Sequence, residues 1–521
     1  MSRKLRLGIY AAGVAVVAAL VIASLVTGTH FRWVYAAVAA LLLFVIRPSS
    51  SLHRWTTAHF GKAKIACTVL VALITITACV LPMGELPVWN GEDAGHRNQY
   101  EVMAESILDG HIDMYYDEED TLAQLENPYD PAQREGHYYH WDHAYYEGHY
   151  YMYFGVVPVF LAFLPYRLLT GEPLTTYHAT QLFVAVFIAG VFVLFRLLSR
   201  LFFKKLPFTV YLSLSVAVSA MSVWYASAEP ALYCTAITAA LALQIWSLYF
   251  FIKAVWGETR ENRQIVLAGV GAVLGALVFG CRPPIALANL LVIPILVTFL
   301  RQRTFSLKLL GKLVLAALPY ALVAAGLMWY NNARFDSPFE FGQAYQLTVA
   351  DQTAYTVRLN KDTLLRVANS FLRVFMYEGS WKENFPYVTT SGVLWNFPLI
   401  WLGLGLFRAP SLGKLRQDKT LSLSLGLPLT VVGIAAIDIM WTPYWLERYN
   451  MDMYFLLGIT LFLAVGYWYA TCGARGRKWL SFAVVAMAGS AVVSAFLLYA
   501  HTVGLYYPAH QSLIAYTWRL L

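Results

Sequence analysis

The chain has 521 residues, of which 59% are hydrophobic and only 13% are charged, about half the charged share usual in soluble proteins. A chain this apolar excludes an ordinary soluble enzyme, a disordered protein and a nucleic-acid-binding protein. One transmembrane helix takes roughly 20 apolar residues, so the hydrophobic residues suffice for about a dozen spans. The net charge of +8 then matters less than its placement along the chain.

The apolar runs predict an all-α membrane protein with about 13 transmembrane helices. The first run, residues 7–26, follows a basic N-terminus and is too long for the core of a signal peptide. We interpret it as an uncleaved span, and residues 1–63 as a unit of two N-terminal spans preceding the main transmembrane domain, residues 64–521. The further runs are 32–48, 64–82, 175–197, 207–225, 230–254, 265–281, 284–300, 308–330, 391–408, 420–441, 450–472 and 479–501.

The placement of Lys and Arg predicts the orientation of these spans. Cytoplasmic loops of membrane proteins are rich in basic residues. With the N-terminus in the cytoplasm and the C-terminus outside, every predicted inner loop is basic. These loops carry Arg47, Arg54, Lys62 and Lys64; Arg200, Lys204 and Lys205; Arg260 and Arg263; Arg301, Arg303, Lys308 and Lys312; Arg408, Lys414, Arg416 and Lys419; and Arg475, Arg477 and Lys478.

One apolar run, residues 154–169, breaks this pattern if it is counted as a span. The run is short, contains Pro158 and Pro165, and would move the basic residues near Arg200 to the outer side. It is therefore predicted to be an interfacial or re-entrant helix on the outer face. It lies in the first of two long outer loops, 83–174 and 331–390. The second loop has helical apolar spacing after residue 360, which predicts an amphipathic helix at the membrane surface.

The first outer loop holds more than half of the chain's 30 acidic residues and half of its 12 histidines. Glu92 and Asp93 follow directly on a span, and burial at a membrane surface raises the pKa of a carboxyl group toward values useful for a general base. Asp142 is an acid among tyrosines and imidazoles, a combination with which proteins also hold sugars. Asp93 is the preferred candidate for the base, with Glu92 and Asp142 as alternatives, and His96 and Arg97 are candidate substrate-binding residues.

Three histidines in this loop, at positions 137, 140 and 143, are spaced three residues apart. This spacing leaves room for a divalent metal ion, but it is weak evidence without a known turn or helix, and we assign no metal ligand.

Several motifs resemble the GT-C glycosyltransferases, which include protein O-mannosyltransferases and the lipid A aminoarabinose transferase. They are the acidic segment followed by a short amphipathic helix, and an aromatic Gly-x-Tyr-Tyr-x-Tyr-Phe-Gly-x-x-Pro entry into the interfacial helix, residues 148–158. Residues 141–159, 332–348 and 447–452 are similar to segments of uncharacterised bacterial members. The resemblance covers the chain from about residue 64 and implies a GT-C-like fold in a bacterial inner membrane.

The protein O-mannosyltransferases carry an Asp-Glu pair a few residues before the tyrosine of the first outer helix. In this chain Glu92 and Asp93 lie further from Tyr100 than that pattern has them. The choice of base therefore stays open between Asp93, Glu92 and Asp142.

The position of these acidic residues on the outer side also indicates the kind of sugar donor. Nucleotide sugars are not supplied outside the cytoplasm, and the chain has no Walker-type phosphate loop, so a transferase there needs a lipid carrier such as polyprenyl phosphate. A phosphate leaving group requires cations. The candidates near outer span ends are Arg97, Arg282, Arg334 and Arg448. Glu447 belongs to the same candidate set, although it could simply pair with Arg448, and Asp438 and Asp452 are expected to face an interior cavity.

These observations predict an inverting membrane glycosyltransferase. It would move a sugar from a polyprenyl-phosphate-linked donor to a glycan, lipid or protein of the cell envelope. Membrane lipids are further expected partners, and no nucleic acid is expected to bind. A transporter or flippase of lipid-linked sugars, and a polymerase or ligase of surface polysaccharide, are the alternatives.

Overall fold

The computed structural model describes residues 62–84, 98–116, 121–230, 232–353, 361–441 and 445–520, together with Ala19. The two spans predicted within residues 1–63 lie outside the described residues, as do Glu92, Asp93, His96 and Arg97.

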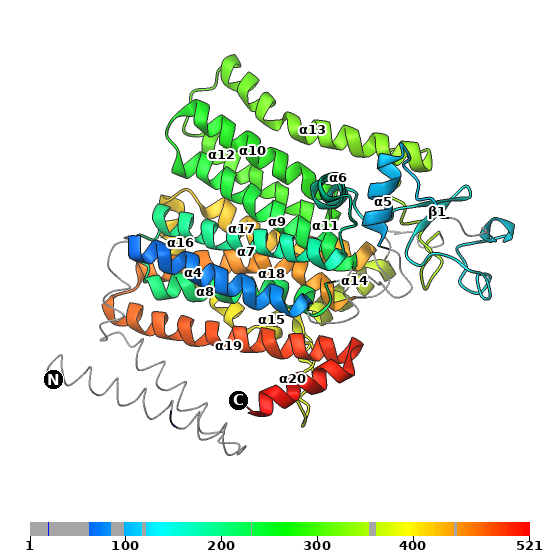
Figure 1. Ribbon diagram of the computed structural model, residues 1–521. Helices are drawn as coiled ribbons and strands as arrows, with labels where there is room; N and C mark the ends of the chain where they lie inside the picture. Colours follow the sequence, from blue (N-terminus) through cyan, green and yellow to red (C-terminus); the bar gives the residue numbers. More distant parts are fainter. Residues whose placement is uncertain are drawn as a thin grey trace.

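Ten helices in the described part are long and apolar enough to cross a membrane, and they lie side by side as one bundle (Figure 1). They confirm the prediction of an all-α membrane protein. Several contain short 3₁₀ or π segments. The ten are α4 (Lys62–Val80) with η1 (Leu81–Gly84), α7 (Thr176–Leu201), α8 (Phe208–Ala228), α9 (Leu232–Ile252) with η5 (Lys253–Gly257), α10 (Glu261–Phe279), α11 (Pro283–Ala286) with η6 (Leu287–Leu291) and α12 (Val292–Leu300), α13 (Leu307–Phe335), α17 (Leu421–Trp441), η8 (Glu447–Asn450) with α18 (Met451–Thr471), and α19 (Ala474–Tyr506).

The predicted span at residues 391–408 has a different structure. It consists of α15 (Val393–Asn396) and the 3₁₀ helix η7 (Pro398–Phe407), which packs along α18. Gly405 lets η7 approach this helix closely, because a Cβ atom there would lie 2.5 Å from the ring of Trp468. η7 is shorter than a standard span and leads into the basic helix α16 (Ala409–Gln417). The predicted total of 13 spans is therefore not confirmed.

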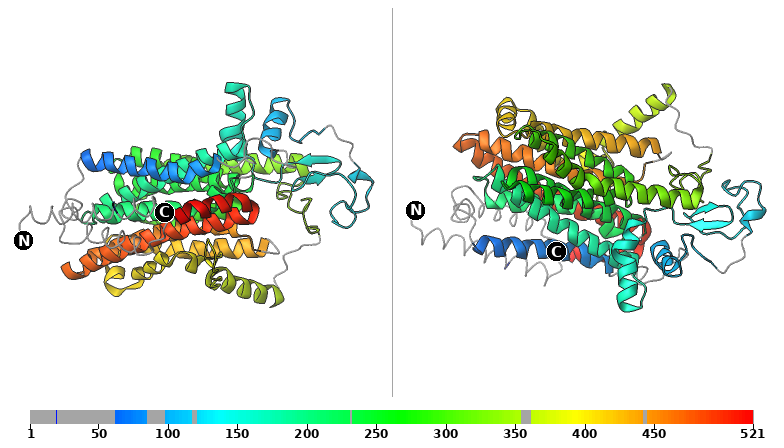
Figure 2. Two further views of the ribbon diagram at one scale, coloured as in Figure 1. Left: turned by 60° about the horizontal axis from the view of Figure 1, so that its bottom comes forward. Right: turned by 90° about the horizontal axis from the view of Figure 1, so that it is seen from above.

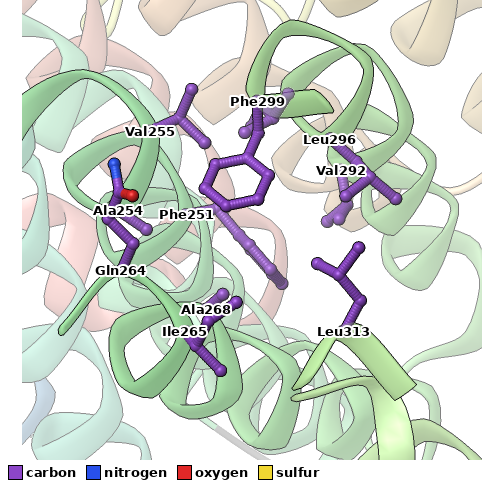
Figure 3. Close-up of a pocket in the computed structure, with 11 residues that line it drawn as sticks. Phe251, Ala254, Val255, Gln264, Ile265, Ala268, Val292, Leu296, Phe299 and Leu313 are labelled. Carbon is purple, nitrogen blue, oxygen red and sulfur yellow. The ribbon is translucent and has the colours of Figure 1, made fainter. Parts of the chain in front are cut away.

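The centre of the bundle is formed by α7, α8, α9 and α18, whose side chains are mostly buried. Small residues allow close packing there, as membrane helices require. Gly458 of α18, for example, faces Val218 of α8 so closely that a Cβ atom would lie 2.3 Å from its methyl group. In contrast, α4 and α13 expose most of their apolar side chains, as helices facing lipid do. An apolar pocket lies between α9, α10, α12 and α13 (Figure 3).

The predicted interfacial helix is confirmed as a helix that does not join the bundle. It consists of the π-helical segment η4 (Val159–Phe163) and α6 (Leu164–Thr170), which stands across the long helices (Figure 2). Pro158 precedes it, and Gly171, with φ +77°, ends it in the left-handed conformation that favours glycine. Leu168 and Leu169 are exposed, as expected for a helix on a membrane surface.

Both long loops lie at one end of the bundle, and the described basic segments lie at the other (Figure 1). The first loop contains α5 (Gln99–Leu108), η3 (Leu122–Gln124) and an antiparallel hairpin of β1 (Ala144–Tyr146) and β2 (His149–Tyr151). The second contains the amphipathic helix α14 (Lys361–Met376), where one was predicted. The chain ends with α20 (Pro508–Leu520). We call the end with the long loops the loop end.

The two loops are joined to each other through the hairpin. The amide of Asp142 donates to the carbonyl of Leu347 at 2.9 Å, and the amide of Leu347 donates to the carbonyl of His143 at 2.9 Å. Glu147 and Gly148 form the hairpin turn with φ values of +50° and +82°. Two positive φ values are typical of a tight two-residue hairpin turn, which explains why the aromatic motif begins with Gly148.

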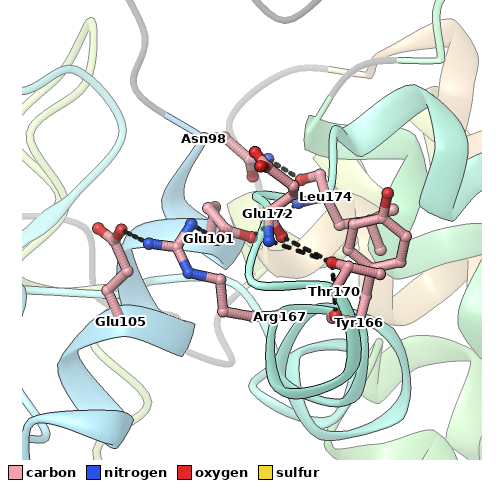
Figure 4. Close-up of polar contacts among 8 residues, drawn as sticks. All are labelled: Asn98, Glu101, Glu105, Tyr166, Arg167, Thr170, Glu172 and Leu174. Carbon is pink, nitrogen blue, oxygen red and sulfur yellow. Dashed lines mark hydrogen bonds and ion pairs between the residues drawn. The ribbon is translucent and has the colours of Figure 1, made fainter.

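Ion pairs fix α5 against the interfacial helix (Figure 4). The Arg167 guanidinium of α6 contacts the carboxylate of Glu101 at 3.1 Å and also that of Glu105. The other oxygen of Glu101 accepts a hydrogen bond from the amide of Leu174 at 3.1 Å, and Asn98 donates to the carbonyl of Leu174 at 2.9 Å. Burial raises the pKa of Glu101, and the Leu174 amide and Arg167 oppose that shift. These contacts hold the start of α5 beside the entry to α7.

Candidate functional site

The candidate site is built around Asp142, which begins the turn into β1 at the loop end of the bundle. Its φ of +57° lies in the left-handed region, which Asp tolerates better than most residues. Its backbone amide donates a hydrogen bond to Leu347, and its backbone carbonyl accepts one from Nε2 of Gln99 at 3.0 Å. Two distant segments of the chain therefore fix the backbone of this residue.

The carboxylate of Asp142 is buried and held from two further sides. The hydroxyl group of Tyr233 donates to Oδ2, and Nε2 of Gln346 donates to Oδ1 at 3.0 Å. Tyr233 lies in the first turn of α9, whereas Gln346 comes from the second outer loop. The carboxylate thus joins the membrane-spanning bundle to both outer loops.

Arg448 lies over the ring of Tyr233. Its guanidinium carbon is 4.2 Å from the centroid of the Tyr233 ring and 5.6 Å from that of Tyr449, distances typical of cation–π contacts. Arg448 forms no ion pair with a described residue. The neighbouring Glu447 does not pair with it, and one oxygen of Glu447 has no hydrogen-bond partner in the described part of the chain. Among the described residues, Arg448 therefore has no carboxylate in direct contact, and the nearby charge of Glu229 acts on it without an ion pair.

Arg282 lies close to this group but its charge is compensated. It precedes α11 and contacts Asp452 through Nε at 2.8 Å and Nη2 at 2.7 Å, with Asp438 at 3.6 Å from Nη2. Burial lowers the pKa of Arg282, but the two carboxylates outweigh that effect and raise it. Its guanidinium also lies 4.8 Å from the Tyr449 ring centroid. Asp438 and Asp452 are therefore buried inside the bundle beside Arg282, a candidate phosphate ligand, and the interior cavity expected there stays a prediction.

The entry to the interfacial helix packs directly on the turn that carries Arg282. The amide of Val157 donates to the carbonyl of Gly280 at 2.9 Å. A Cβ atom on Gly155 would lie 2.3 Å from that carbonyl oxygen, so the second glycine of the aromatic motif is required by close backbone contact. The motif therefore positions the interfacial helix against the α10–α11 turn.

Arg334, another candidate phosphate ligand, is buried and has other partners. It donates to the carbonyl of Met152 at 2.7 Å and to Oδ1 of Asn331 at 2.9 Å, and it lies 3.8 Å from the ring centroid of Tyr330. These contacts hold the segment after β2 against the end of α13. Arg334 therefore packs the loop, and its contact with phosphate stays a prediction.

The three spaced histidines do not converge on one point. Nδ1 of His137 lies 3.0 Å from Oγ1 of Thr121, His140 stacks on Tyr116, and Nε2 of His143 lies 2.7 Å from the hydroxyl of the same tyrosine. In the part of the chain that the structure describes, no group of three His, Cys, Asp or Glu residues could hold a metal ion.

Sequence reasoning named Gln346 as a residue that could line a sugar or lipid pocket, but it missed two members of the site. Tyr233 gave no signal, because a tyrosine at a span end is common. Glu229 ends α8 as an acid between two apolar runs, which is a signal for a functional residue. It is 8% exposed, one of its oxygens has no hydrogen-bond partner among the described residues, and burial raises its pKa. Tyr225 and the charge of Arg448 oppose that shift, which places Glu229 next to Arg448.

No protein-family model and no curated protein matches the sequence. Three solved structures are similar to it. The apo oligosaccharyltransferase of Archaeoglobus fulgidus matches with a TM-score of 0.42 and 12% identity over 84% of this chain and 56% of that chain. ArnT from Cupriavidus metallidurans, bound to undecaprenyl phosphate, matches with a TM-score of 0.41 and 13% identity over 87% of this chain and 78% of that chain.

The third structure is AglB from Archaeoglobus fulgidus in complex with an inhibitory peptide and a dolichol-phosphate. Its TM-score is 0.41, with 13% identity over 85% of this chain and 56% of that chain. The chain therefore spans just over half the length of the archaeal enzymes. At this level of similarity we base the functional proposal on the contacts of the site.

Proposed function

We propose that the chain is a membrane glycosyltransferase that moves a sugar from a polyprenyl-phosphate-linked donor to a cell-envelope acceptor at the loop end. The observation that carries this proposal is the Asp142–Tyr233–Arg448 arrangement. The hydroxyl group of Tyr233 donates to a fixed carboxylate, and an arginine that forms no ion pair with a described residue lies over the ring of the same tyrosine. A base and an anion-binding cation at this spacing suit a reaction that deprotonates one substrate and releases a phosphate from the other.

In the proposed reaction, the carboxylate of Asp142 accepts the proton of the acceptor hydroxyl group. The hydroxyl oxygen then bonds to the anomeric carbon, and the bond from that carbon to the phosphate oxygen breaks. The electron pair of this bond passes to the phosphate, so the products are the glycosylated acceptor with inverted configuration and the polyprenyl phosphate. Arg448 stabilises the charge that develops on the leaving oxygen.

Four predicted site residues outside the described part keep their roles as proposals. Asp93, or its neighbour Glu92, is the alternative base, and His96 and Arg97 are further donors to the phosphate. The orientation is also proposed from the sequence. The N-terminus faces the cytoplasm of a bacterium, and the loop end and the C-terminus face outward across its inner membrane.

The test compares cells that carry the wild-type chain with cells that carry Asp142→Asn, Asp93→Asn or Glu92→Gln. Glycans, lipids and proteins of the envelope are profiled by mass spectrometry. We expect one glycosylated species to disappear when the base is replaced, while the exposed turn residue Glu147, replaced by Gln, serves as a control and leaves the profile unchanged. An unchanged profile in all three test variants, each present at normal level in the membrane, contradicts the proposal.

A flippase of lipid-linked sugars is the second candidate, because Asp438 and Asp452 place two buried carboxylates within spans. Such groups mark translocation paths in transporters. Here both lie beside Arg282, which favours a structural ion cluster. Proteoliposomes containing a labelled lipid-linked sugar separate the two functions. A flippase exposes the label on the other leaflet without any acceptor, whereas the proposed transferase changes the label only when an acceptor is present. A polysaccharide polymerase or ligase would instead yield a polysaccharide product.

A further inference from the structure

The apolar pocket drawn in Figure 3 is lined by residues next to the basic segments 260–263 and 301–312, at the end of the bundle opposite the long loops (Figure 1). Its empty space of about 350 Å³ includes the part that is open at the surface, so it is an apolar groove rather than an enclosed cavity. Its walls come from the last turns of α9 and η5, the first turns of α10, and the facing sides of α12 and α13. The proposed transferase reaction makes no use of it.

The walls of this pocket are suited to a hydrocarbon chain. Every lining side chain is apolar except Gln264. The amide group of Gln264 is already engaged, because Nε2 donates to the carbonyl of Glu258 at 2.8 Å and Oε1 accepts from Arg303. A buried water molecule needs two to four polar partners. No polar group of the lining residues is free to bind a water molecule, so the pocket favours an apolar ligand.

The pocket also has an unusual backbone at one wall. Ala254 and Val255 belong to η5, a π-helical turn that extends α9. Single π-helical turns are rare and occur frequently at functional sites.

A charged cluster borders the pocket. The guanidinium of Arg303 lies 5.0 Å from the ring centroid of Phe299, a lining residue. Arg303 and Lys312 both contact Glu261, at 2.9 Å and 2.6 Å, so two cations share one carboxylate. Arg301 and Lys308 are exposed in the same segment and form no ion pair with a described residue. The border of the pocket therefore carries an excess of positive charge.

We propose that this pocket is a binding site for an anionic glycerophospholipid. One acyl chain occupies the apolar pocket, and the phosphate lies at the basic segment 301–312. Apolar clefts between membrane helices with basic residues at one end recognise anionic head groups through this combination of forces. This lipid site is separate from the proposed transferase site. The result of its test therefore does not decide the transferase function.

The test measures lipids bound to the purified full chain by native mass spectrometry. Phosphatidylglycerol and phosphatidylcholine with identical acyl chains are added in turn, with glycerol phosphate as a head group without chains. We expect phosphatidylglycerol to bind at least tenfold more tightly than phosphatidylcholine, and glycerol phosphate not to bind. Equal binding of the two lipids, or binding of glycerol phosphate alone, overturns the proposal.

Two variants locate the site. Ala268→Phe fills the pocket and should abolish tight phosphatidylglycerol binding, whereas Val266→Phe adds the same ring to an exposed position of α10 and should not. The double variant Arg301→Gln with Lys308→Gln leaves packing untouched and should weaken phosphatidylglycerol binding about tenfold. Unchanged binding in a folded Ala268→Phe protein refutes the proposal. If that variant does not fold, an unchanged preference for phosphatidylglycerol in the double variant refutes it instead.

Discussion

Arg282 and Asp452 join the turn between α10 and α11 to the first turn of α18, with Nε and Nη2 of the arginine 2.8 Å and 2.7 Å from the same carboxylate oxygen. Asp452 is fully buried, and Asp438 of α17 lies 3.6 Å from Nη2. Three membrane segments therefore meet at one guanidinium group, directly beside the tyrosine that contacts Arg448. The ion cluster therefore helps to hold the residues of the site in position.

Replacing Asp452 by Asn should destabilise the bundle, because removing one partner of a buried ion pair leaves the other charge uncompensated. The expected loss is about 3 kcal/mol in the free energy of unfolding. Unfolding in mixed micelles by denaturant titration measures it. Asp418→Asn is the matched control, since its pair with Lys414 lies within one helix end and is worth about 0.5 kcal/mol. Equal losses in the two variants would show that the Arg282 cluster is not structural.

Tyr233→Phe removes the hydroxyl group that donates to Asp142 and keeps the ring beneath Arg448. A hydrogen bond to a charged group is worth about 1.5–3 kcal/mol, so we expect kcat for transfer to fall by about tenfold to a hundredfold with little change in the KM for the lipid donor. Tyr320→Phe is the control. It removes a hydroxyl that donates to Asn289 at 3.2 Å and does not touch Asp142. A change in KM alone would assign Tyr233 to donor binding.

Arg448→Met should weaken binding of undecaprenyl phosphate, used as the probe, by at least tenfold, because the proposed phosphate ligand is lost. Arg448→Lys keeps the charge without the planar guanidinium, so we expect intermediate binding. Arg373→Met provides the control, since Arg373 also lies over a tyrosine, Tyr377, but is exposed on α14. Native mass spectrometry measures all three, and equal affinity in Arg448→Met and the wild type would remove Arg448 from the phosphate site.

Hydropathy and charge placement predicted most of the fold because the bilayer imposes simple constraints on length and polarity. The same rules identified the interfacial helix, since Pro158, Pro165 and the downstream basic loop together excluded a span. They failed at residues 391–408, where the apolar run forms a 3₁₀ helix whose approach to Trp468 depends on Gly405. That structure is set by tertiary packing, which a hydropathy profile does not record.

The site was predictable in part for a similar reason. Asp142 stands out in the sequence as an acid among tyrosines and imidazoles, and Arg282 and Arg448 stand out as charges at span ends. The sequence does not show which residues they contact, because those residues come from distant segments. Tyr233 and Asp142 are 91 positions apart, and Gln346 and Asp142 are 204 apart. The sequence alone also gave no means to see that Asp452 and Asp438 compensate Arg282, leaving Arg448 as the better candidate for a phosphate.

Gly155→Ala should disturb the junction between the interfacial helix and the α10–α11 turn, because the new methyl group would overlap the carbonyl oxygen of Gly280. Overpacking of this kind costs about 1–3 kcal/mol, and we expect a lower thermal unfolding midpoint. Gly413→Ala is the control, since nothing lies within 4 Å of a Cβ atom there and alanine favours the α16 helix. A Gly155→Ala protein as stable as Gly413→Ala would show that the close contact is not maintained.

Glu229→Gln should change how the stability of the protein depends on pH. Burial raises the folded-state pKa of this carboxyl group above its ordinary value of 4.5. Between 4.5 and the raised pKa the folded state therefore binds more protons than the unfolded state, and stability falls as pH rises through this range. Glutamine cannot ionise, so the variant does not lose this stability as the pH rises.

The unfolding midpoint of Glu229→Gln relative to the wild type should therefore become more favourable between pH 4.5 and pH 8, as measured by thermal scans at matched ionic strength. The exposed Glu172, replaced by Gln, is the control and should show no such trend. If the midpoint of Glu229→Gln instead falls relative to the wild type as the pH rises, the ionised carboxylate is stabilised in the folded state. Arg448 would then interact with Glu229 rather than with a phosphate.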